Sequence, residues 1–290
     1  MSKPLTFTRP TILLLGTGRS GTTWLAGLLA SPFRYRLLFE PFMPHQVPGS
    51  ACIADRYYEP DQIPVAVGQF CHRALDDRIN SNWIAQSSNR KYRMHRWRFW
   101  PKVRICKDIR SNLFIPAYRT LFGPSLPIVV LMRHPGAVVE SFLRVKFPWA
   151  TDISQLRQQT AFAERFDLPL AGLQRFDHTD ATKIAIRWVL ENGYLLQHAA
   201  QFGVHLLFYE DLIADPVPTI HSLCDQIGIQ PVENLSELVS QPSYTTHAQS
   251  PLYDTNRVIT DSWQKRLTAE NLQAIQAVLD TAQIRYPRPL

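Results

Sequence analysis

The sequence lacks long hydrophobic runs and paired cysteines. Within its 290 residues, no apolar segment approaches the roughly 20 residues that a membrane-spanning helix needs. The apolar stretch from Ile12 to Leu15 is also too short for a signal peptide. We therefore expect no membrane span and a cytoplasmic location with reduced thiols. The spacing of the cysteines indicates neither a zinc knuckle nor a disulfide framework, and we expect no metal site; they are Cys52, Cys71, Cys106 and Cys224.

Acidic residues are fewer than basic ones. Asp and Glu number 24 against 31 Lys and Arg, which gives a formal net charge of +7. Such an excess suits a polyanionic ligand, which includes a nucleic acid, a phosphorylated cofactor or an acidic substrate. The charge alone does not choose among them. The remaining composition, 45% hydrophobic and 19% charged, is typical of a folded globular chain and excludes disorder as the main state.

Short apolar segments alternate with helical patterns along the chain. This alternation predicts a three-layer α/β/α fold with a central parallel sheet covered on both faces. We expect a single domain over residues 1–290, with an irregular insertion at about 44–101. The expected strands are 11–15, 35–39, 103–106, 128–132 and 204–209. The expected helices are 22–29, 112–121, one that begins at Pro135, 181–201, 218–227 and 267–282.

The turn after the first strand, GTGRSGTTW at 16–24, predicts an anion site, because backbone N–H groups and a helix N-terminus converge there. Two known patterns fit it. Gly16, Gly18 and Gly21 match the dinucleotide fingerprint G-x-G-x-x-G, and Glu40 follows at the distance typical of an NAD enzyme. The same turn matches the phosphate-loop frame G-x-x-x-x-G-K-[ST] except that Thr22 replaces the lysine, which disfavours magnesium-dependent hydrolysis of a nucleoside triphosphate.

Arg19 favours a third interpretation. A guanidinium within the turn can donate two parallel hydrogen bonds to an anion, and the hydroxyl side chains that follow it are further donors. The alternative is that Arg19 is solvated and the threonines only cap the helix. The motif Arg19–Trp24 resembles the 5′-phosphosulfate loop, (K/R)-S-G-(T/S)-(T/S)-(W/F), of sulfotransferases that use 3′-phosphoadenosine-5′-phosphosulfate (PAPS) and release PAP. The resemblance implies their phosphate-loop-like fold and a cofactor site made of Gly18, Arg19, Ser20, Gly21, Thr22, Thr23 and Trp24.

A second element supports this resemblance. Arg133 ends the fourth strand, and Ser141 lies in the helix that follows it, so both side chains could bind the same phosphate. Alone, the pair is also common in chains without such a site. The sulfotransferase family has an Arg-to-Ser element of this spacing, and the resemblance implies that Arg133 and Ser141 bind the 3′-phosphate. The C-terminal cofactor loop of the cytosolic family members is not evident, and we expect Arg257 in its place.

Sulfuryl transfer to a hydroxyl or amine acceptor needs cations at the donor, a role for Arg19, and a base opposite them. Glu40 is our candidate base, because the resemblance is closer to carbohydrate and protein sulfotransferases, in which a glutamate serves this role. The alternative for Glu40 is an ion pair with an arginine. His45 is the reserve base and a candidate acceptor contact, since histidine titrates near neutral pH. Lys107 and Arg110 could contact the sulfate or an acidic acceptor, or form a solvated pair.

The segment 89–104, NRKYRMHRWRFWPKVR, interleaves basic and aromatic residues and contains no acid. We expect it to line the acceptor site or form a lid, ahead of a solvated surface, and binding of nucleic acid is the least favoured role. The sequence thus predicts a PAPS-dependent sulfotransferase acting on a small-molecule, carbohydrate or lipid acceptor. The main alternative is an NAD-dependent oxidoreductase, and the third is a non-enzymatic polyanion-binding module. The sequence does not indicate the oligomeric state.

Overall fold

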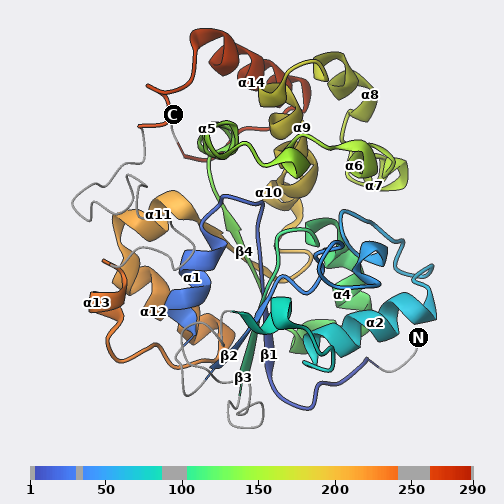
Figure 1. Ribbon diagram of the computed structural model, residues 1–290, viewed down its shortest axis with the longest axis vertical. Coiled ribbons are helices and arrows are strands. Elements are labelled where there is room, and N and C mark those ends of the chain that lie inside the picture. Colours follow the sequence, from blue (N-terminus) through green and yellow to red (C-terminus); the bar gives the residue numbers. More distant parts are fainter. Residues whose placement is uncertain (1–3, 31–34, 87–102, 241–261, 289–290) are drawn as a thin grey trace.

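A five-stranded parallel sheet forms the centre of the computed structural model, which describes residues 4–30, 35–86, 103–240 and 262–288 (Figure 1). The strand order is β2-β3-β1-β4-β5. The strands are β1 (Thr11–Leu15), β2 (Tyr35–Phe39), β3 (Val103–Lys107), β4 (Ile128–Met132) and β5 (Val204–Phe208). The predicted fold class is therefore confirmed, and each expected strand is present within one residue of its expected bounds.

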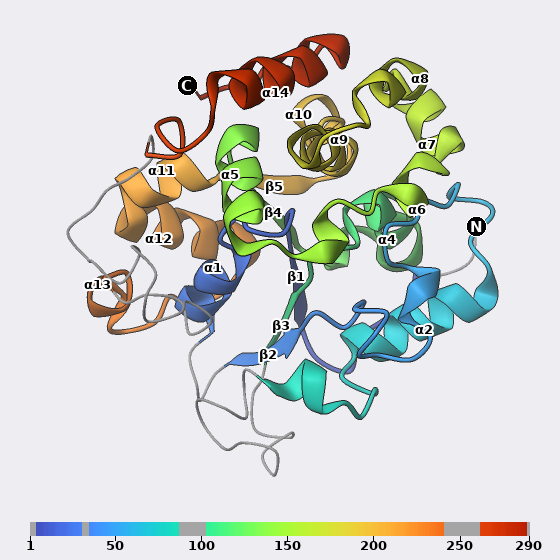
Figure 2. The same ribbon diagram turned by 45° about the horizontal axis from the view of Figure 1, so that its top comes forward.

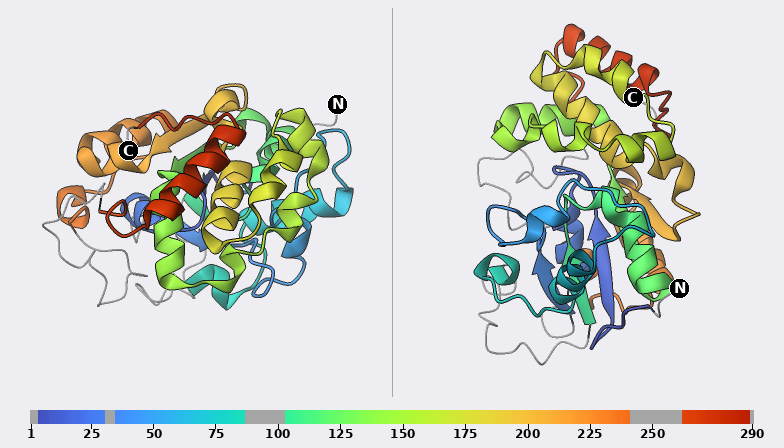
Figure 3. Two further views of the ribbon diagram at one scale, coloured as in Figure 1. Left: turned by 90° about the horizontal axis from the view of Figure 1, so that it is seen from above. Right: turned by 90° about the vertical axis from the view of Figure 1, so that its right-hand side faces the viewer.

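Helices cover both faces of the sheet. They are α1 (Thr22–Leu29), α2 (Val65–Leu75), α4 (Ile115–Phe122), α5 (Pro135–Val145), α6 (Ser154–Arg157), α7 (Thr160–Arg165), α8 (Leu170–Leu173), α9 (Asp180–Asn192), α10 (Leu195–His198), α11 (Tyr209–Ala214), α12 (Pro216–Ile227), α13 (Leu235–Leu238) and α14 (Ala269–Thr281). Seen from above, the orange segment with α12 and the cyan segment with α2 lie on opposite sides of the molecule (Figure 3). Among the described residues, none of these helices has both the length and the apolar character needed to cross a membrane.

Alternation along β1 produces two hydrophobic cores. Successive side chains of a strand point to opposite faces. Leu13 and Leu15 accordingly pack into the core formed with α2, α4, α5, α9 and α14, whereas Ile12 and Leu14 pack into the core formed with α1, α12 and α13. Within the larger core, α9 contacts both α5 and α14, and these three helices lie together in Figure 2.

Two expectations about secondary structure were wrong in part. The stretch at 44–101 was expected to be irregular, yet it contains the regular helix α2, whose buried residues Val67, Cys71, Ala74 and Leu75 have helical spacing. The long helix expected at 181–201 ends at Asn192, and α10 follows after Gly193. At Gly193 a Cβ atom would lie 2.3 Å from Cδ1 of Ile284, so the chain approaches too closely there for a side chain.

The parallel arrangement gathers the carboxyl ends of all five strands at one edge of the sheet, which we call the carboxyl edge. Ligands of open α/β sheets bind at this edge. The strand β1 lies between β3 and β4, so the turns after these three strands are neighbours. The outer strands β2 and β5 bring Glu40 and Tyr209, which directly follow them, to the same edge.

Candidate functional site

The glycine turn at 16–21 connects β1 to α1 and has an unusual backbone. Gly21 caps the helix with φ 92°, and Arg19 has φ 71°, both in the left-handed region that glycine tolerates best. The N–H group of Ser20 donates to the carbonyl of Thr17 at 3.1 Å and closes the turn. A Cβ atom at Gly21 would lie 2.7 Å from the ring of Tyr209, which leaves no room for a side chain. The turn is therefore compact, and it leads directly into the first turn of α1.

The turn also contains polar groups that suit an oxyanion. The hydroxyl Oγ of Ser20 is fully buried and has no hydrogen-bond partner among the described residues. The first N–H groups of a helix have no partner within the helix. Buried polar groups normally have a hydrogen-bond partner. The residues present at this turn consequently fit a bound phosphate or sulfate group.

Two arginines meet at this turn. The Nε atom of Arg19 donates to Oγ of Ser141 at 3.0 Å, and Nη1 of Arg133 donates to the carbonyl of Arg19 at 3.0 Å. The guanidinium of Arg133 lies 4.5 Å from the ring centre of Tyr209, which in turn meets Trp24 edge-on at 6.4 Å. The structure thus brings together the turn and the Arg133–Ser141 pair, which are far apart in the sequence.

The positive charge at the turn is concentrated. Burial and the neighbouring cations Arg144 and Arg133 lower the pKa of Arg19, while Glu140 opposes them. Glu140 is itself bound by Arg144 at 3.1 Å and by Arg266 at 2.7 Å. A group of guanidinium ions with so few carboxylates favours an anionic ligand.

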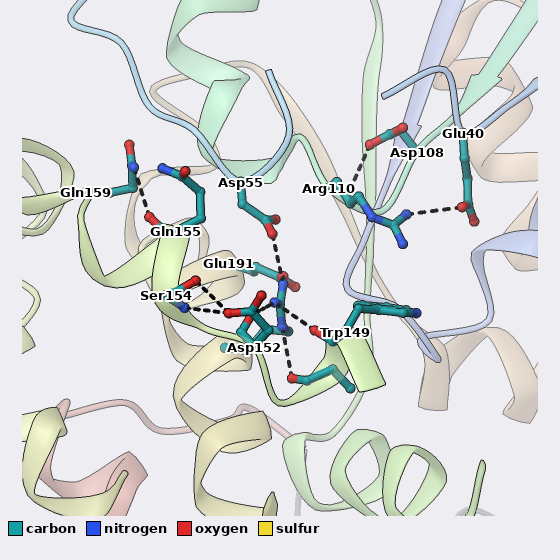
Figure 4. A network of polar contacts seen from close by, with 12 residues as sticks. Glu40, Asp55, Asp108, Arg110, Trp149, Asp152, Ser154, Gln155, Gln159 and Glu191 are labelled. Carbon is teal, nitrogen blue, oxygen red and sulfur yellow. Dashed lines mark hydrogen bonds and ion pairs between the residues drawn. The ribbon is translucent and has the colours of Figure 1, made fainter. Parts of the chain in front are cut away.

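Glu40 forms a second charged cluster at the carboxyl edge. Its Oε1 lies 2.5 Å from Nζ of Lys107. Its Oε2 lies 3.2 Å from Nη1 of Arg110 (Figure 4). All three side chains are buried, so the alternative of a solvated Lys107–Arg110 pair is wrong. Burial alone would raise the pKa of Glu40, but Lys107 and Arg110 together lower it. Glu40 is consequently ionised at neutral pH.

The backbone holds Glu40 in a strained conformation. Its φ is 43°, which is uncommon for a residue other than glycine. Its N–H donates to the carbonyl of Lys107 at 2.7 Å, and its carbonyl accepts a hydrogen bond from Nε1 of Trp83 at 3.2 Å. These contacts fix the turn after β2 against the end of β3.

Trp149 connects the two charged groups. It belongs to the short 3-10 helix Pro148–Ala150, and the guanidinium of Arg110 lies 4.6 Å from its ring centre. A Cβ atom at Gly18 would lie 2.7 Å from Cη2 of the indole, so the ring reaches the glycine turn. The indole of Trp149 therefore lies against the glycine turn and against the Glu40 cluster.

Buried Arg187 of α9 holds Trp149 in place. Its guanidinium donates to the carbonyls of Trp149 and Ala150, both at 3.2 Å. It also pairs with Asp55 at 3.3 Å and with Glu191 at 2.8 Å (Figure 4). The sequence analysis missed both Trp149 and Arg187. The usable signal was the charged pair Arg187 and Glu191, spaced i,i+4 on the helix face that also carries the buried residues Ile184 and Trp188.

The other expected site residues are less closely associated. His45 is exposed, on the turn that follows Glu40. Arg257 and residues 89–102 of the basic aromatic segment lie outside the described residues, and the roles expected for them stay predictions. The described residues contain no group of three or more His, Cys, Asp or Glu that could hold a metal ion.

The strand order disagrees with the dinucleotide interpretation. In a dinucleotide-binding fold, the strand that ends in the ribose-binding acid lies next to the strand before the glycine turn. Here β3 separates β2 from β1, so Glu40 is two strands away, or about 10 Å. Glu40 also uses both carboxylate oxygens for Lys107 and Arg110. This strand order disfavours the alternative of an NAD site built from Gly16, Gly18, Gly21 and Glu40.

One family model matches this chain, and several solved structures resemble it. The chain resembles, in structure, the sulfotransferase domain of an olefin synthase from Synechococcus (18% identity, TM-score 0.48, 99% of each chain covered). It also resembles retinol dehydratase solved with retinol and PAP (16% identity, TM-score 0.46, 96% of this chain and 84% of that one). None of the curated proteins compared with the chain matches it. The family model "Sulfotransferase family" matches residues 10–234, and this protein therefore belongs to the sulfotransferase family.

Proposed function

We propose that this protein transfers the sulfuryl group of PAPS to a hydroxyl or amine of an acceptor, with Glu40 as the general base. The observation that carries the proposal is the juxtaposition of two charged groups at the carboxyl edge. Arg19, Arg133 and buried Ser20 lie at the glycine turn. Glu40 lies with Lys107 and Arg110, and the indole of Trp149 lies against both the glycine turn and Arg110. A cationic donor site opposite a carboxylate is what group transfer to a hydroxyl requires.

The glycine turn would hold the phosphosulfate end of the donor. Ser20, Thr22 and Thr23 supply hydroxyl groups, and Arg19 supplies a charge that opposes the negative charge developing on the leaving phosphate. Trp24 would pack near the nucleotide, as the sequence resemblance implies. PAPS, when bound, supplies the sulfuryl group, and PAP is the product. Metal ions have no role in this proposal.

The second phosphate would lie at Arg133 and Ser141. Both side chains reach the glycine turn through Arg19, so Arg19 connects the two phosphate sites. Arg257 remains the proposed C-terminal contact, on the sequence resemblance alone.

Glu40 would receive the proton of the acceptor. Its low pKa keeps the carboxylate ionised at neutral pH, and Lys107 and Arg110 keep its orientation fixed. Both oxygens already accept hydrogen bonds from these cations, so the acceptor group must share or displace one of them. Lys107 and Arg110 are also placed to contact the sulfuryl oxygens or an acidic acceptor. His45, exposed on the adjacent turn, is the reserve candidate for the base and for an acceptor contact.

The proposed acceptor is a small molecule, a carbohydrate or a lipid, and not a nucleic acid. The four cysteines are all free thiols, which supports the proposal of a reducing compartment such as the cytoplasm.

Ligand-dependent thermal unfolding tests the proposed donor. A ligand that binds only the folded state stabilises that state and raises the melting temperature. At a concentration of one hundred times its Kd, the free energy of unfolding increases by about 2.7 kcal/mol. We expect PAP to raise it and NAD⁺ to leave it unchanged. A screen of acceptors with ³⁵S-labelled PAPS would then identify the acceptor class. Stabilisation by NAD⁺ but not by PAP would overturn the proposal.

A further inference from the structure

A buried carboxylate joins the turns that carry Glu40 and Arg110. Asp108 directly follows β3 and is fully buried. Its Oδ1 accepts a hydrogen bond from the backbone N–H of Arg110 at 2.7 Å (Figure 4). Its Oδ2 accepts one from the backbone N–H of Phe42 at 3.1 Å. Its own N–H donates to the carbonyl of Leu14 at 2.9 Å. One residue therefore connects the turn after β2, the turn after β3 and the strand that leads into the glycine turn.

These contacts reach the Glu40–Arg110 ion pair through the backbone of Arg110 itself and through the backbone of Phe42. Phe42 lies two residues after Glu40, on the turn where Glu40 has its left-handed φ of 43°. Such a conformation persists only when surrounding contacts hold it. Arg110 is held at its own N–H and reaches Glu40 with its guanidinium at 3.2 Å. Asp108 thus sets the distance between the two turns without contacting the carboxylate of Glu40.

Complete burial of the Asp108 side chain disfavours its ionised form, so the ionised carboxylate depends on its hydrogen bonds. Burial raises the pKa of Asp108 to about 6, and the charge of Glu40 adds to this, while the two backbone N–H groups and the charge of Arg110 oppose it. The other titratable groups that interact with it are Cys71 of α2, Cys106 of β3 and Tyr118 of α4. Buried charges are disfavoured unless they are paired or hydrogen-bonded.

We propose that Asp108 is a positioning residue for sulfuryl transfer, because the two hydrogen bonds that its carboxylate accepts hold the turn of Glu40 and the turn of Arg110 against each other. The inference rests on the proposed function, in which Glu40 receives the proton. An asparagine at this position keeps the volume but has a single acceptor oxygen, so its NH₂ group faces one of the two backbone N–H groups. Protonation of the carboxylate places an O–H group in the same conflict.

The test compares Asp108→Asn with the control Asp76→Asn. Asp76 is buried as well, and its Oδ1 accepts hydrogen bonds from the N–H of Thr8 at 2.9 Å and from Nη1 of Arg104 at 2.7 Å. Arg104 lies at the beginning of β3, whereas Lys107 ends it. Both variants should have lower melting temperatures, but only Asp108→Asn should lower kcat, by about 10- to 100-fold, because misplacement of reacting groups costs this much. Its Kd for PAP should be unchanged.

The pH profile of kcat, measured with the acceptor found in the labelled-PAPS screen, provides a second readout. In the wild type, kcat should fall as the pH drops through about 6, where Asp108 becomes protonated. In Asp108→Asn this fall should move to lower pH, since the pKa of Glu40 is below its usual range. A variant with the wild-type kcat and profile, or a loss of kcat equal to that of Asp76→Asn, would overturn the inference.

A crystal structure of Asp108→Asn separates this inference from the proposed function. The inference expects the contact between Arg110 and Glu40 to be lost, whether or not PAPS is the donor. A retained contact in the variant overturns the positioning role. A wild-type protein that transfers no label from PAPS would instead contradict the proposed function.

Discussion

Glu40 combines a strained backbone with a carboxylate that two cations hold ionised. In Glu40→Gln the side chain keeps its shape but can no longer take up the proton of the acceptor. We expect kcat to fall by about 10²- to 10⁴-fold, the usual contribution of a general base. The affinity for PAP, measured by calorimetry, should be unchanged because the glycine turn is separate from β2. Unchanged turnover would remove Glu40 as the base.

The matched control for this variant is Asp77→Asn. Asp77 is a buried carboxylate that binds Nη2 of Arg36 at 3.2 Å. Arg36 lies near the beginning of β2, and Glu40 directly follows its end. The control should lose stability without a comparable loss of kcat. Equal losses in both variants would mean that Glu40 acts on stability and not on catalysis.

Arg19 links the two proposed phosphate sites, because it donates to Ser141 and accepts from Arg133. Hydrogen bonds from a charged donor contribute about 1.5–3 kcal/mol each, so we expect Arg19→Ala to weaken PAP binding by about 10- to 100-fold. Calorimetric titration with PAP measures this directly. Arg175→Ala, at an exposed arginine of the 3-10 helix Gln174–Phe176, is the control and should bind PAP like the wild type. An intact PAP affinity in Arg19→Ala would contradict the role of Arg19.

At the scale of elements, the sequence predicts best what depends on neighbours along the chain. The five strands and the glycine turn follow from local apolar runs and local glycine spacing, and Glu40, Lys107 and Arg133 lie at strand ends that the runs define. Asp108 also directly follows a predicted strand, but its hydrogen-bond partner on the turn after β2 is not indicated locally, and Trp149 carries no such signature. Their roles come from contacts with segments distant in sequence, since Asp108 binds Phe42 and Trp149 is held by Arg187.

Charged residues on apolar helix faces carry a signal that sequence analysis can use. Arg187 and Glu191 face the same side of α9 as the buried residues Ile184 and Trp188. A buried ion pair is weak support for stability, so its presence on a packed face points to a specific positional role. Here that role is to bind the carbonyl groups of the turn that carries Trp149. The partner, however, could only be identified from the tertiary structure.

At the scale of the molecule, strand order separates the two interpretations that the glycine turn allows. The motif matched both a dinucleotide site and a phosphosulfate site, because both require glycines at similar positions. The choice depends on which strand lies beside β1, and that is a non-local property of the sheet. Because β3 lies between β2 and β1, Glu40 pairs with Lys107 at the end of β3 and with Arg110 on the turn after it, and not with the glycine turn. Local sequence patterns contain no measure of this order.

Global stability should depend on pH through the buried carboxyl group of Glu191. Burial raises its pKa to about 7 and Asp55 adds to this, although Arg187 opposes them; the usual value is 4.5. A raised pKa in the folded state contributes stability that is present below the usual pKa and is lost as the pH rises through about 7. Glutamine cannot ionise, so Glu191→Gln should lose less stability than the wild type between pH 5 and pH 8.

Urea unfolding at pH 5, 6.5 and 8 measures this difference. The free energy of unfolding of Glu191→Gln, minus that of the wild type, should become more positive as the pH rises, whatever its value at pH 5. Groups that titrate identically in both proteins cancel in this subtraction. Glu164→Gln, at an exposed position of α7, is the control and should show a difference that does not change with pH. A pH-independent difference for Glu191→Gln would mean that Arg187 keeps Glu191 ionised throughout this range, and that the network around Trp149 remains fully charged.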